Sequence, residues 1–186
     1  MRARMALSYA GVTVNICEIS LKDKPAQMLQ VSPKGTVPVL VLLDGKVIDQ
    51  SLEIMHWALQ QRDIDGWLVL DSIETKQLIV DNDDAFKLAL DKYKYAIRFP
   101  EQSAQDYRSQ GEVFLSKLEE KLEKTSFLIR DTLSLADIAI FPFVRQFAGV
   151  DPVWFESADY PKLKAWLQNL VESELFKRVM EKQPIK

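Results

Sequence analysis

The chain contains very little cysteine and histidine, the residues that build disulfides and many metal sites. Its 186 residues include one cysteine, Cys17, and one histidine, His56. A single cysteine excludes an internal disulfide, so the natural expectation is the reducing cytoplasm. A lone histidine without a cluster of cysteines or carboxylates is more often an ordinary helix residue than a metal ligand or a general base. The sequence therefore indicates no metal site, and Cys17 is interpreted as a small buried residue of a strand.

The sequence also lacks an excess of one charge and any long apolar run. Its 24 Lys and Arg residues are scattered among 27 Asp and Glu residues, which gives a formal net charge of −3. This pattern provides no basic face for nucleic acid and no polybasic anchor for a membrane. No apolar stretch approaches the roughly 20 residues that cross a bilayer, and Met1 to Leu7 does not resemble a secretory signal. We expect a folded globular protein that binds neither nucleic acid nor membranes.

The N-terminal residues begin with a helical pattern and continue as a strand. Arg2 to Ala10 consists of good helix formers and stops at Gly11, a residue that readily closes helices. Val12 to Ile16 then alternates apolar and polar side chains, which predicts a strand with one buried face.

A second strand pattern leads into a helix. Val39 to Leu43 is apolar at every position, which predicts a strand covered on both faces. Asp44-Gly45 predicts a two-residue hairpin turn, after which Lys46 to Ile48 returns antiparallel. The next segment, from Leu52 to Gln61, predicts an amphipathic helix with Ile54, Trp57 and Ala58 or Leu59 available for the core.

From Asp71 onward the apolar pattern has a helical period. A long helix is expected to end at Pro100, and Leu135 to Val144 is apolar nearly all round and must be a buried helix. A further helix begins at Tyr160-Pro161, and a short last helix reaches Met180. The expected core face of the long helix contains Ile79, Phe86, Leu90, Tyr93 and Ile97, and that of the following helix contains Tyr107, Phe114, Leu118 and Leu122.

Val37-Pro38 is the first candidate binding element. If this peptide bond is cis, the Val37 backbone N–H and C=O are free to pair with the peptide group of a ligand, and only an X-Pro bond makes cis accessible at about 0.5–1 kcal/mol. The alternative is an ordinary proline ahead of a strand.

Gln50-Ser51 is the second candidate, because it stands at the start of a predicted helix. The unpaired N–H groups and partial positive charge of a helix N-terminus would allow Ser51 to hold a carboxylate, and the Gln50 carbonyl could bind an adjacent ammonium. The alternative is a serine N-cap that stabilises the helix by about 1 kcal/mol. Together, the two elements fit a small peptide with a free amino-acid end.

These residues resemble the glutathione site of the glutathione transferase family. The resemblance lies in Thr36 to Leu40 and in Gln50 to Ile54, and it continues in Ser134 to Ile138 and Tyr160 to Trp166. It implies a thioredoxin-like N-terminal domain, which here would lack its first strand, followed by an all-helical bundle domain. The domains are then expected at residues 1–62 and 72–186, with a linker at 63–71.

The resemblance also implies roles for individual residues. Val37, beside Pro38, would pair with the cysteinyl backbone of glutathione, Gln50 and Ser51 would hold its γ-glutamyl end, and Lys34 would face its glycyl carboxylate. The second substrate, an unknown electrophile or disulfide, would lie between the domains against the long helix. Glutathione is the expected ligand, no metal is expected, and family members are usually homodimers. The residues implied for the second substrate are Asp83, Phe86, Lys87 and Leu90.

Ser134 and Asp137 have a direct physical interpretation beside the resemblance. The serine side chain accepts from the backbone N–H of Asp137 while the aspartate reaches back to the Ser134 N–H, which forms a capping box. This pair is expected to be structural.

The chain departs from the family pattern at its beginning. In the family, a first strand leads to a Ser, Cys or Tyr that acts at the glutathione sulfur, and nothing here precedes Met1. No catalytic residue is assigned, since Tyr9 belongs to a helix end and Cys17 to a strand. Without the first strand, either its two neighbours pair directly, or another segment fills the gap, or the true start lies upstream. A truncated start is the favoured interpretation.

Two functions remain open at this stage. The first is a glutathione transferase-like protein whose full-length form transfers or exchanges groups at the glutathione sulfur. The second is a non-catalytic glutathione-fold module that acts through its helical domain and dimer surface.

Overall fold

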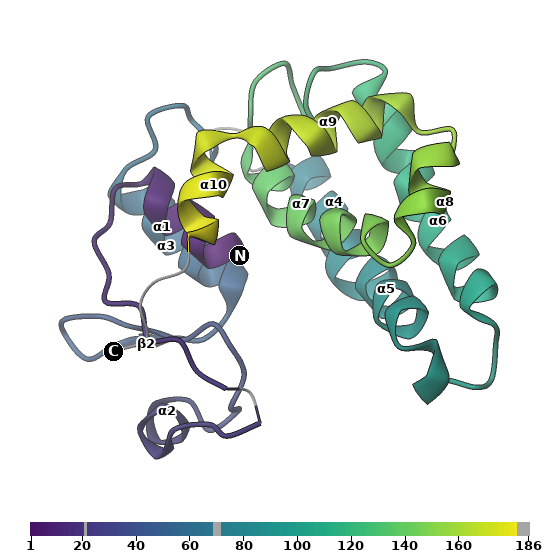
Figure 1. Ribbon diagram of the computed structural model, residues 1–186. Coiled ribbons are helices and arrows are strands. Elements are labelled where there is room, and N and C mark those ends of the chain that lie inside the picture. Colours follow the sequence, from purple (N-terminus) through teal and green to yellow (C-terminus); the bar gives the residue numbers. More distant parts are fainter. Residues whose placement is uncertain (21, 69–71, 182–186) are drawn as a thin grey trace. The chain divides into compact units, whose positions relative to one another are not determined.

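A computed structural model describes residues 1–20, 22–68 and 72–181 of the chain. The chain divides into two compact units (Figure 1). Unit 1 comprises Met1–Ile64 together with the helix α10 (Glu174–Met180), and unit 2 comprises Asp65–Ser173. Unit 1 contains short helices and a hairpin, whereas unit 2 is helical, in agreement with the expected fold class. The last residues of the linker predicted at 63–71 lie outside the described residues.

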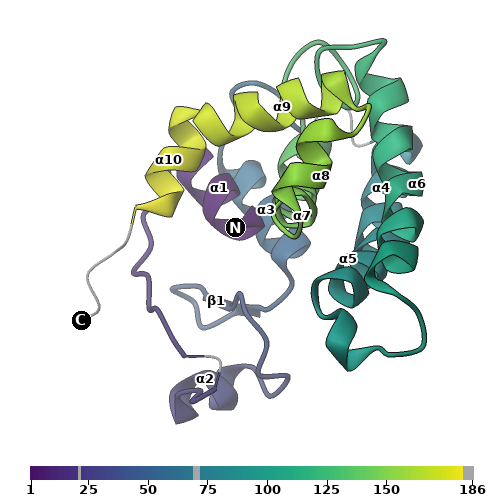
Figure 2. The same cartoon turned by 45° about the vertical axis from the view of Figure 1, so that its right-hand side comes forward.

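The helix α1 (Arg2–Tyr9) forms where good helix formers predicted it. Gly11 has a φ of 69°, and the Val12 N–H bonds the Leu7 carbonyl at 3.0 Å, which is the bond that closes a helix in a Schellman motif. In unit 1, α1 packs against α3 (Ser51–Gln61) and α10 (Figures 1 and 2). The core position on α3 assigned to Trp57 belongs to Met55, which is fully buried.

The only sheet among the described residues is a two-stranded antiparallel hairpin of β1 (Leu40–Val41) and β2 (Val47–Ile48), with Leu40 opposite Ile48. The Leu42 N–H bonds the Lys46 carbonyl at 2.8 Å, so three residues form the loop and not the two predicted. Gly45 has a φ of 85°, as expected for a type I turn followed by a bulge. The hairpin was predicted correctly and its turn type was not.

One strand prediction and one burial prediction in unit 1 are wrong. Val12 to Ile16 forms no strand, because no described segment pairs with its backbone. The stretch from Val39 to Leu43 is not covered on both faces, since Val41 is half-exposed and Leu43 is fully exposed. A short helix, α2 (Ala26–Val31), follows Pro25 and was not predicted.

The first long helical stretch described in unit 2 contains a π-turn. α4 (Ile73–Asp81), the π-helical η1 (Asn82–Phe86) and α5 (Lys87–Lys94) follow one another without a break. A 3₁₀ turn, η2 (Ala96–Arg98), comes next. Because the α-helical stretch ends at Lys94, Ile97 lies outside the predicted core face and is fully exposed.

The remaining helices described in unit 2 are α6 (Ala104–Leu122), α7 (Leu135–Ala148), α8 (Pro152–Ser157) and α9 (Pro161–Glu172). α7 is buried along most of its length, as its all-round apolar sequence predicts. α8 was not predicted. Among the described residues, none of the helices combines the length and hydrophobicity that a bilayer crossing needs.

An aromatic cluster fills the middle of unit 2. The ring centroid of Phe86 lies 4.8 Å from that of Phe114 and 5.2 Å from that of Phe147, and Tyr93 lies 5.1 Å from Phe147. These distances are typical of stabilising aromatic pairs. The cluster fixes α5, α6 and α7 against the π-turn.

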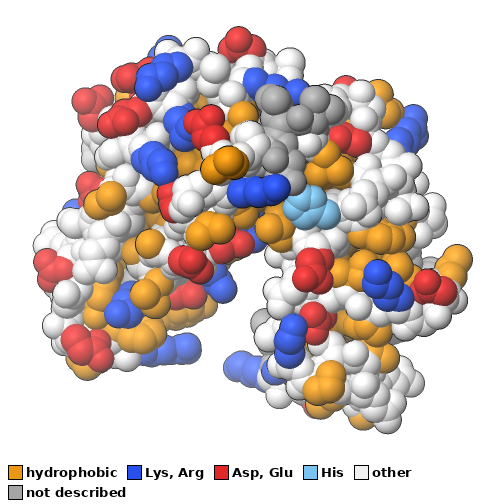
Figure 3. Space-filling view, turned by 180° about the vertical axis from the view of Figure 1, so that it is seen from behind, with side chains coloured by type: hydrophobic (Ala, Val, Ile, Leu, Met, Phe, Trp, Pro, Cys, Tyr) orange, Lys and Arg blue, Asp and Glu red, His pale blue; other side chains and the backbone are white. Residues whose placement is uncertain are grey.

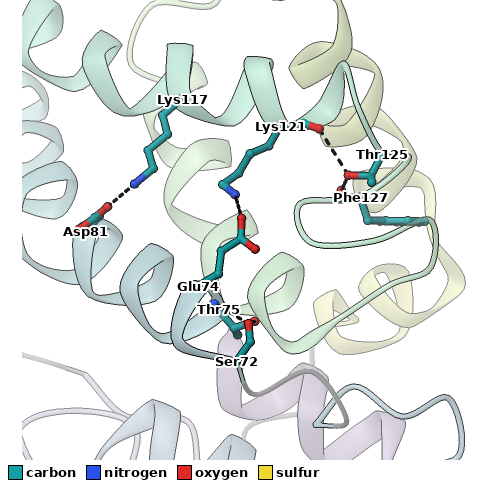
Figure 4. Close-up of polar contacts among 8 residues, drawn as sticks. All are labelled: Ser72, Glu74, Thr75, Asp81, Lys117, Lys121, Thr125 and Phe127. Atoms are coloured by element: carbon teal, nitrogen blue, oxygen red, sulfur yellow. Dashed lines mark hydrogen bonds and ion pairs between the residues drawn. The ribbon is translucent and has the colours of Figure 1, made fainter.

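Polar contacts join α6 to its neighbours. The buried Glu119 carboxylate accepts from the N–H groups of Lys162 at 2.9 Å and Leu163 at 2.7 Å, where a negative charge stabilises the N-terminus of α9. On the α4 side, Lys117 bonds Asp81 at 2.6 Å and Lys121 bonds Glu74 (Figure 4). Both carboxyl groups have a pKa below the ordinary value, chiefly because of the hydrogen bonds from these lysines.

Candidate functional site

The hairpin of unit 1 leads the predicted binding residues toward one another. Leu40 lies opposite Ile48 in the antiparallel ladder. The Val37-Pro38 segment lies just before β1, and Gln50, the residue before α3, lies just after β2. The hairpin therefore brings the two segments back toward the same end of the ladder.

The backbone N–H and C=O groups of Val37 are available to a ligand. The Val37-Pro38 peptide bond is cis, and Val37 is half-exposed. Among the described residues, no hydrogen bond uses the N–H or C=O of Val37. The residue can therefore offer one donor and one acceptor to an extended peptide ligand.

The N-terminus of α3 is also open. Gln50 is the N-cap, and its side chain makes no capping hydrogen bond. The first intrahelical hydrogen bond runs from the Ile54 N–H to the Gln50 carbonyl, at 3.0 Å. The N–H groups of Ser51, Leu52 and Glu53 thus have no helical partner. The alternative that Ser51 only caps the helix is wrong, because Ser51 is the first helical residue and its hydroxyl bonds none of the described residues.

Lys34 and Asp49 form an ion pair beside these groups. Lys34 Nζ bonds Asp49 Oδ1 at 3.1 Å, and the Ser32 hydroxyl donates to Asp49 Oδ2 at 3.0 Å. The two bonds tie the loop before Val37 to the residue before Gln50. Sequence reasoning found Lys34 and missed Asp49, although an aspartate directly between a strand and a helix start was a usable signal.

The Asp49 carboxyl is expected to titrate below its ordinary pKa of about 3.9. The Lys34 hydrogen bond is the largest cause of this lowering and the Ser32 bond is the next. Because the folded pKa is the lower one, the bonds stabilise the loop above the unfolded pKa and are lost as pH falls through the folded pKa. In an NMR titration, Lys34→Met should raise the pKa of Asp49 more than Ser32→Ala does.

Lys46→Met is the matched control for this titration, since Lys46 is an exposed lysine of the same hairpin and no bond joins it to Asp49. It should leave the Asp49 pKa unchanged. An Asp49 pKa that rises as much in Lys46→Met as in Lys34→Met would show a general charge effect in place of the ion pair.

The four residues predicted for a second substrate are not brought together at one surface. Phe86 and Leu90 lie in the core of unit 2, where each is 1% exposed. Asp83 is half-buried and accepts from Asn82 Nδ2 at 2.8 Å, and Lys87 is exposed. The helical period had placed Phe86 and Leu90 on the core face, which the structure confirms; it was the resemblance that implied a role for them at the second substrate.

Ser134 and Asp137 form a capping box at the start of α7. The Asp137 carboxylate, fully buried, accepts from the Ser134 N–H at 2.9 Å and from the Ser134 hydroxyl at 2.5 Å. Its other oxygen accepts from the Leu128 N–H and the Trp166 indole N–H, each at 2.9 Å. Burial raises the pKa of Asp137, and these donors oppose the rise. The sequence did not indicate the last two donors.

The remaining candidates, Cys17 and Tyr9, do not form a catalytic group with other described side chains. Cys17 is exposed, so its interpretation as a buried strand residue is wrong; the segment around it is not a strand. The Tyr9 hydroxyl bonds Asp63 at 3.2 Å. Within the described residues, no group of three or more His, Cys, Asp or Glu side chains could hold a metal ion. On the face in Figure 3, charges of both signs are interspersed.

Two family models match the sequence. The model for the N-terminal domain of glutathione S-transferase matches residues 1–61, and that for the C-terminal domain of glutathione S-transferase matches residues 80–174. Together they span most of both units.

Curated relatives and solved structures agree with these matches. Glutathione S-transferase omega-1 of Sus scrofa is 25% identical over 92% of this chain and 71% of the relative. Elongation factor 1-gamma of Drosophila melanogaster is 23% identical over 75% of this chain, which spans 34% of that relative. The glutathione transferase URE2P6 of Phanerochaete chrysosporium, solved with oxidized glutathione, has a TM-score of 0.82 at 19% identity, covering 97% of this chain and 89% of that one. This last similarity concerns the fold.

Proposed function

Because the chain belongs to the glutathione S-transferase family, we propose that it binds glutathione at the junction of Val37 and the N-terminus of α3. The observation that carries the proposal is the hairpin, which leads an unused backbone amide toward an open helix N-terminus. Glutathione combines a peptide backbone with a free α-carboxylate, so it needs both groups at once. The relative solved with oxidized glutathione supports the same ligand class.

Each part of the ligand has a matching group. The α-carboxylate of the γ-glutamyl end would accept from the Ser51 N–H and hydroxyl, where the helix dipole also favours negative charge. The Gln50 carbonyl would bind the neighbouring ammonium. Val37 would pair with the cysteinyl backbone. Lys34 has three donors and uses one on Asp49, so its ammonium can also face the glycyl carboxylate.

The proposed reaction class is group transfer or exchange at the glutathione sulfur. The residues of this chain bind and orient the peptide, and none of them is assigned to the sulfur itself. We further propose that the protein is a cytoplasmic homodimer. The second substrate would be an electrophile or a disulfide.

A non-catalytic binding module is the second candidate. It is favoured by the similarity to elongation factor 1-gamma, and by the lack of an assembled nucleophile among the described residues, where Tyr9 is bonded to Asp63 and Cys17 lies exposed in an irregular segment. Glutathione binding without turnover of an electrophile or a disulfide would support this candidate.

Ser51→Ala is expected to weaken glutathione binding by roughly 5- to 30-fold, since a hydrogen bond to a charged group contributes about 1–2 kcal/mol. The helix N–H groups remain, so binding should be reduced and not abolished. Isothermal titration calorimetry with reduced glutathione measures the change directly.

Ser109→Ala is the matched control, because Ser109 is an exposed serine on α6 in unit 2. It should bind glutathione like the parent chain. If the parent chain does not bind millimolar glutathione, or if both variants weaken binding equally, the proposed site is contradicted.

A further inference from the structure

Asp49 is held in place by a hydrogen bond from a buried side chain. It stands between β2 and Gln50, the N-cap of α3. Its Oδ2 atom accepts from the hydroxyl of Ser32, a residue that is 1% exposed. The Ser32 N–H bonds the Met28 carbonyl at 2.9 Å, which fixes the donor as well. The Asp49 carboxylate therefore has a defined position, and its other oxygen, Oδ1, accepts from Lys34.

Lys34 is the mobile partner in this contact. Its side chain is 56% exposed, whereas that of Asp49 is 22% exposed. An exposed lysine samples many rotamers, and a ligand that orders it must overcome the loss of side-chain entropy. The bond to Asp49, at 3.1 Å, already restricts the ammonium group. It uses one of the three ammonium donors, so the others can face a ligand.

We propose that Asp49 is a positioning residue that orders Lys34 for the terminal carboxylate of the ligand, so that the site selects γ-glutamyl peptides with a free carboxylate after the cysteinyl residue. The inference rests on the proposed function and adds a residue that does not itself touch the ligand. Because Lys34 is ordered in advance, the ligand does not have to immobilise it, and this preorganisation increases affinity.

The opposite effect, competition between Asp49 and the ligand carboxylate for Lys34, is the weaker one. Competition requires that the ammonium leave Asp49, but a lysine with three donors can bond both carboxylates at once. The negative charge of Asp49 also reduces the attraction of Lys34 for a ligand, yet water and salt screen charges at an exposed side chain. The entropy cost of ordering Lys34 is not screened, so the positioning effect is the larger.

Calorimetry with two ligands, reduced glutathione and its monoethyl ester at glycine, tests the inference. The ester keeps the peptide backbone and the γ-glutamyl end and lacks only the charge of the glycyl carboxylate. The carboxylate preference is the dissociation constant of the ester divided by that of glutathione. Asp49→Asn should lower this preference by roughly two- to fivefold and leave the affinity for the ester unchanged. A merely structural role of Asp49 would instead weaken both ligands equally.

Asp44→Asn is the matched control, because it removes the same charge from an exposed residue of the same hairpin. The Asp44 carboxylate accepts from the Lys46 N–H, and asparagine keeps an acceptor there. This variant should retain the carboxylate preference of the parent chain. Lys34→Met should lower the preference at least as far as Asp49→Asn does. In the Lys34→Met background, Asp49→Asn should have no further effect, since a positioning residue acts only through the lysine.

The outcomes separate this inference from the proposed function. A parent chain that binds neither ligand contradicts the proposed function and the inference with it. If the parent chain binds glutathione but Asp49→Asn keeps or increases the carboxylate preference, the binding site stands and the positioning role is wrong. Equal weakening of both ligands, or an effect of Asp49→Asn that persists in the Lys34→Met background, would also overturn the positioning role.

Discussion

Asp137→Ala is expected to lower the free energy of unfolding of unit 2 by about 3–5 kcal/mol, because it leaves four buried donors without an acceptor. The donors come from Ser134, Leu128 and Trp166, which lie on three different segments. Loss of the carboxylate thus removes the hydrogen bonds that join α7 to Leu128 and to Trp166 of α9, as well as the cap of α7. For a unit of this size the melting temperature should fall by roughly 12 to 20 °C.

Asp106→Ala is the matched control for this substitution. Ser103 and Asp106 form the same capping box at the start of α6, but they are exposed and the carboxylate serves only that box. Its loss should lower the stability of unit 2 much less than the loss of Asp137 does. Equal losses for the two variants would show that the buried hydrogen bonds add nothing. Since the expected role of Asp137 is structural, its variant should lose stability before glutathione affinity; lost affinity with an unchanged melting temperature would contradict that role.

Gly111→Ala should destabilise unit 2 by about 1–3 kcal/mol through overpacking. Alanine is normally the better helix residue by about 1 kcal/mol, so the expected sign is the reverse of the propensity. A Cβ atom at Gly111 would lie 2.7 Å from Cζ of Phe147 and still closer to Cε2. Phe147 is fully buried among other aromatic rings and has little room to move. Denaturant unfolding with fluorescence detection measures the change.

A double-mutant cycle identifies the clash as the cause. Phe147→Leu makes room for the added methyl group, so Gly111→Ala should cost less in that background than in the parent chain. Gly149→Ala is a control in the same unit, because its Cβ would meet no aromatic ring. The nearest atom would be the Arg145 carbonyl oxygen at 3.3 Å, and the backbone of Gly149 is already right-handed helical. A neutral or stabilising Gly111→Ala would contradict the packing argument.

The elements that local pattern determines were predicted well, and those that need a distant partner were not. α7 followed from an apolar sequence on all sides, and the end of α1 followed from Gly11. Val12 to Ile16 has the alternating apolar and polar residues of a strand. This alternation shows which side chains would face the core, but a strand also needs a neighbouring strand to hydrogen-bond, and no described segment provides one.

The candidate site shows the same division. Val37, Gln50 and Ser51 could be proposed because each is defined by its immediate sequence context. The ion pair between Lys34 and Asp49 depends on the hairpin register and is not encoded in a short motif. The helical period placed Phe86 on the core face, where the structure has it, whereas the resemblance assigned it to the second substrate.

The π-turn at Asn82–Phe86 allows the long helix of unit 2 to lose one residue without changing how it packs. A π-turn closes its hydrogen bonds one residue later than an α-helical turn, so it holds one extra residue without turning the segments on either side. Removal of one residue from this turn would let the stretch close as a regular helix while α4 and α5 keep their core faces. In evolutionary terms, this is a point where the gene can lose a single codon and still encode the same packed unit.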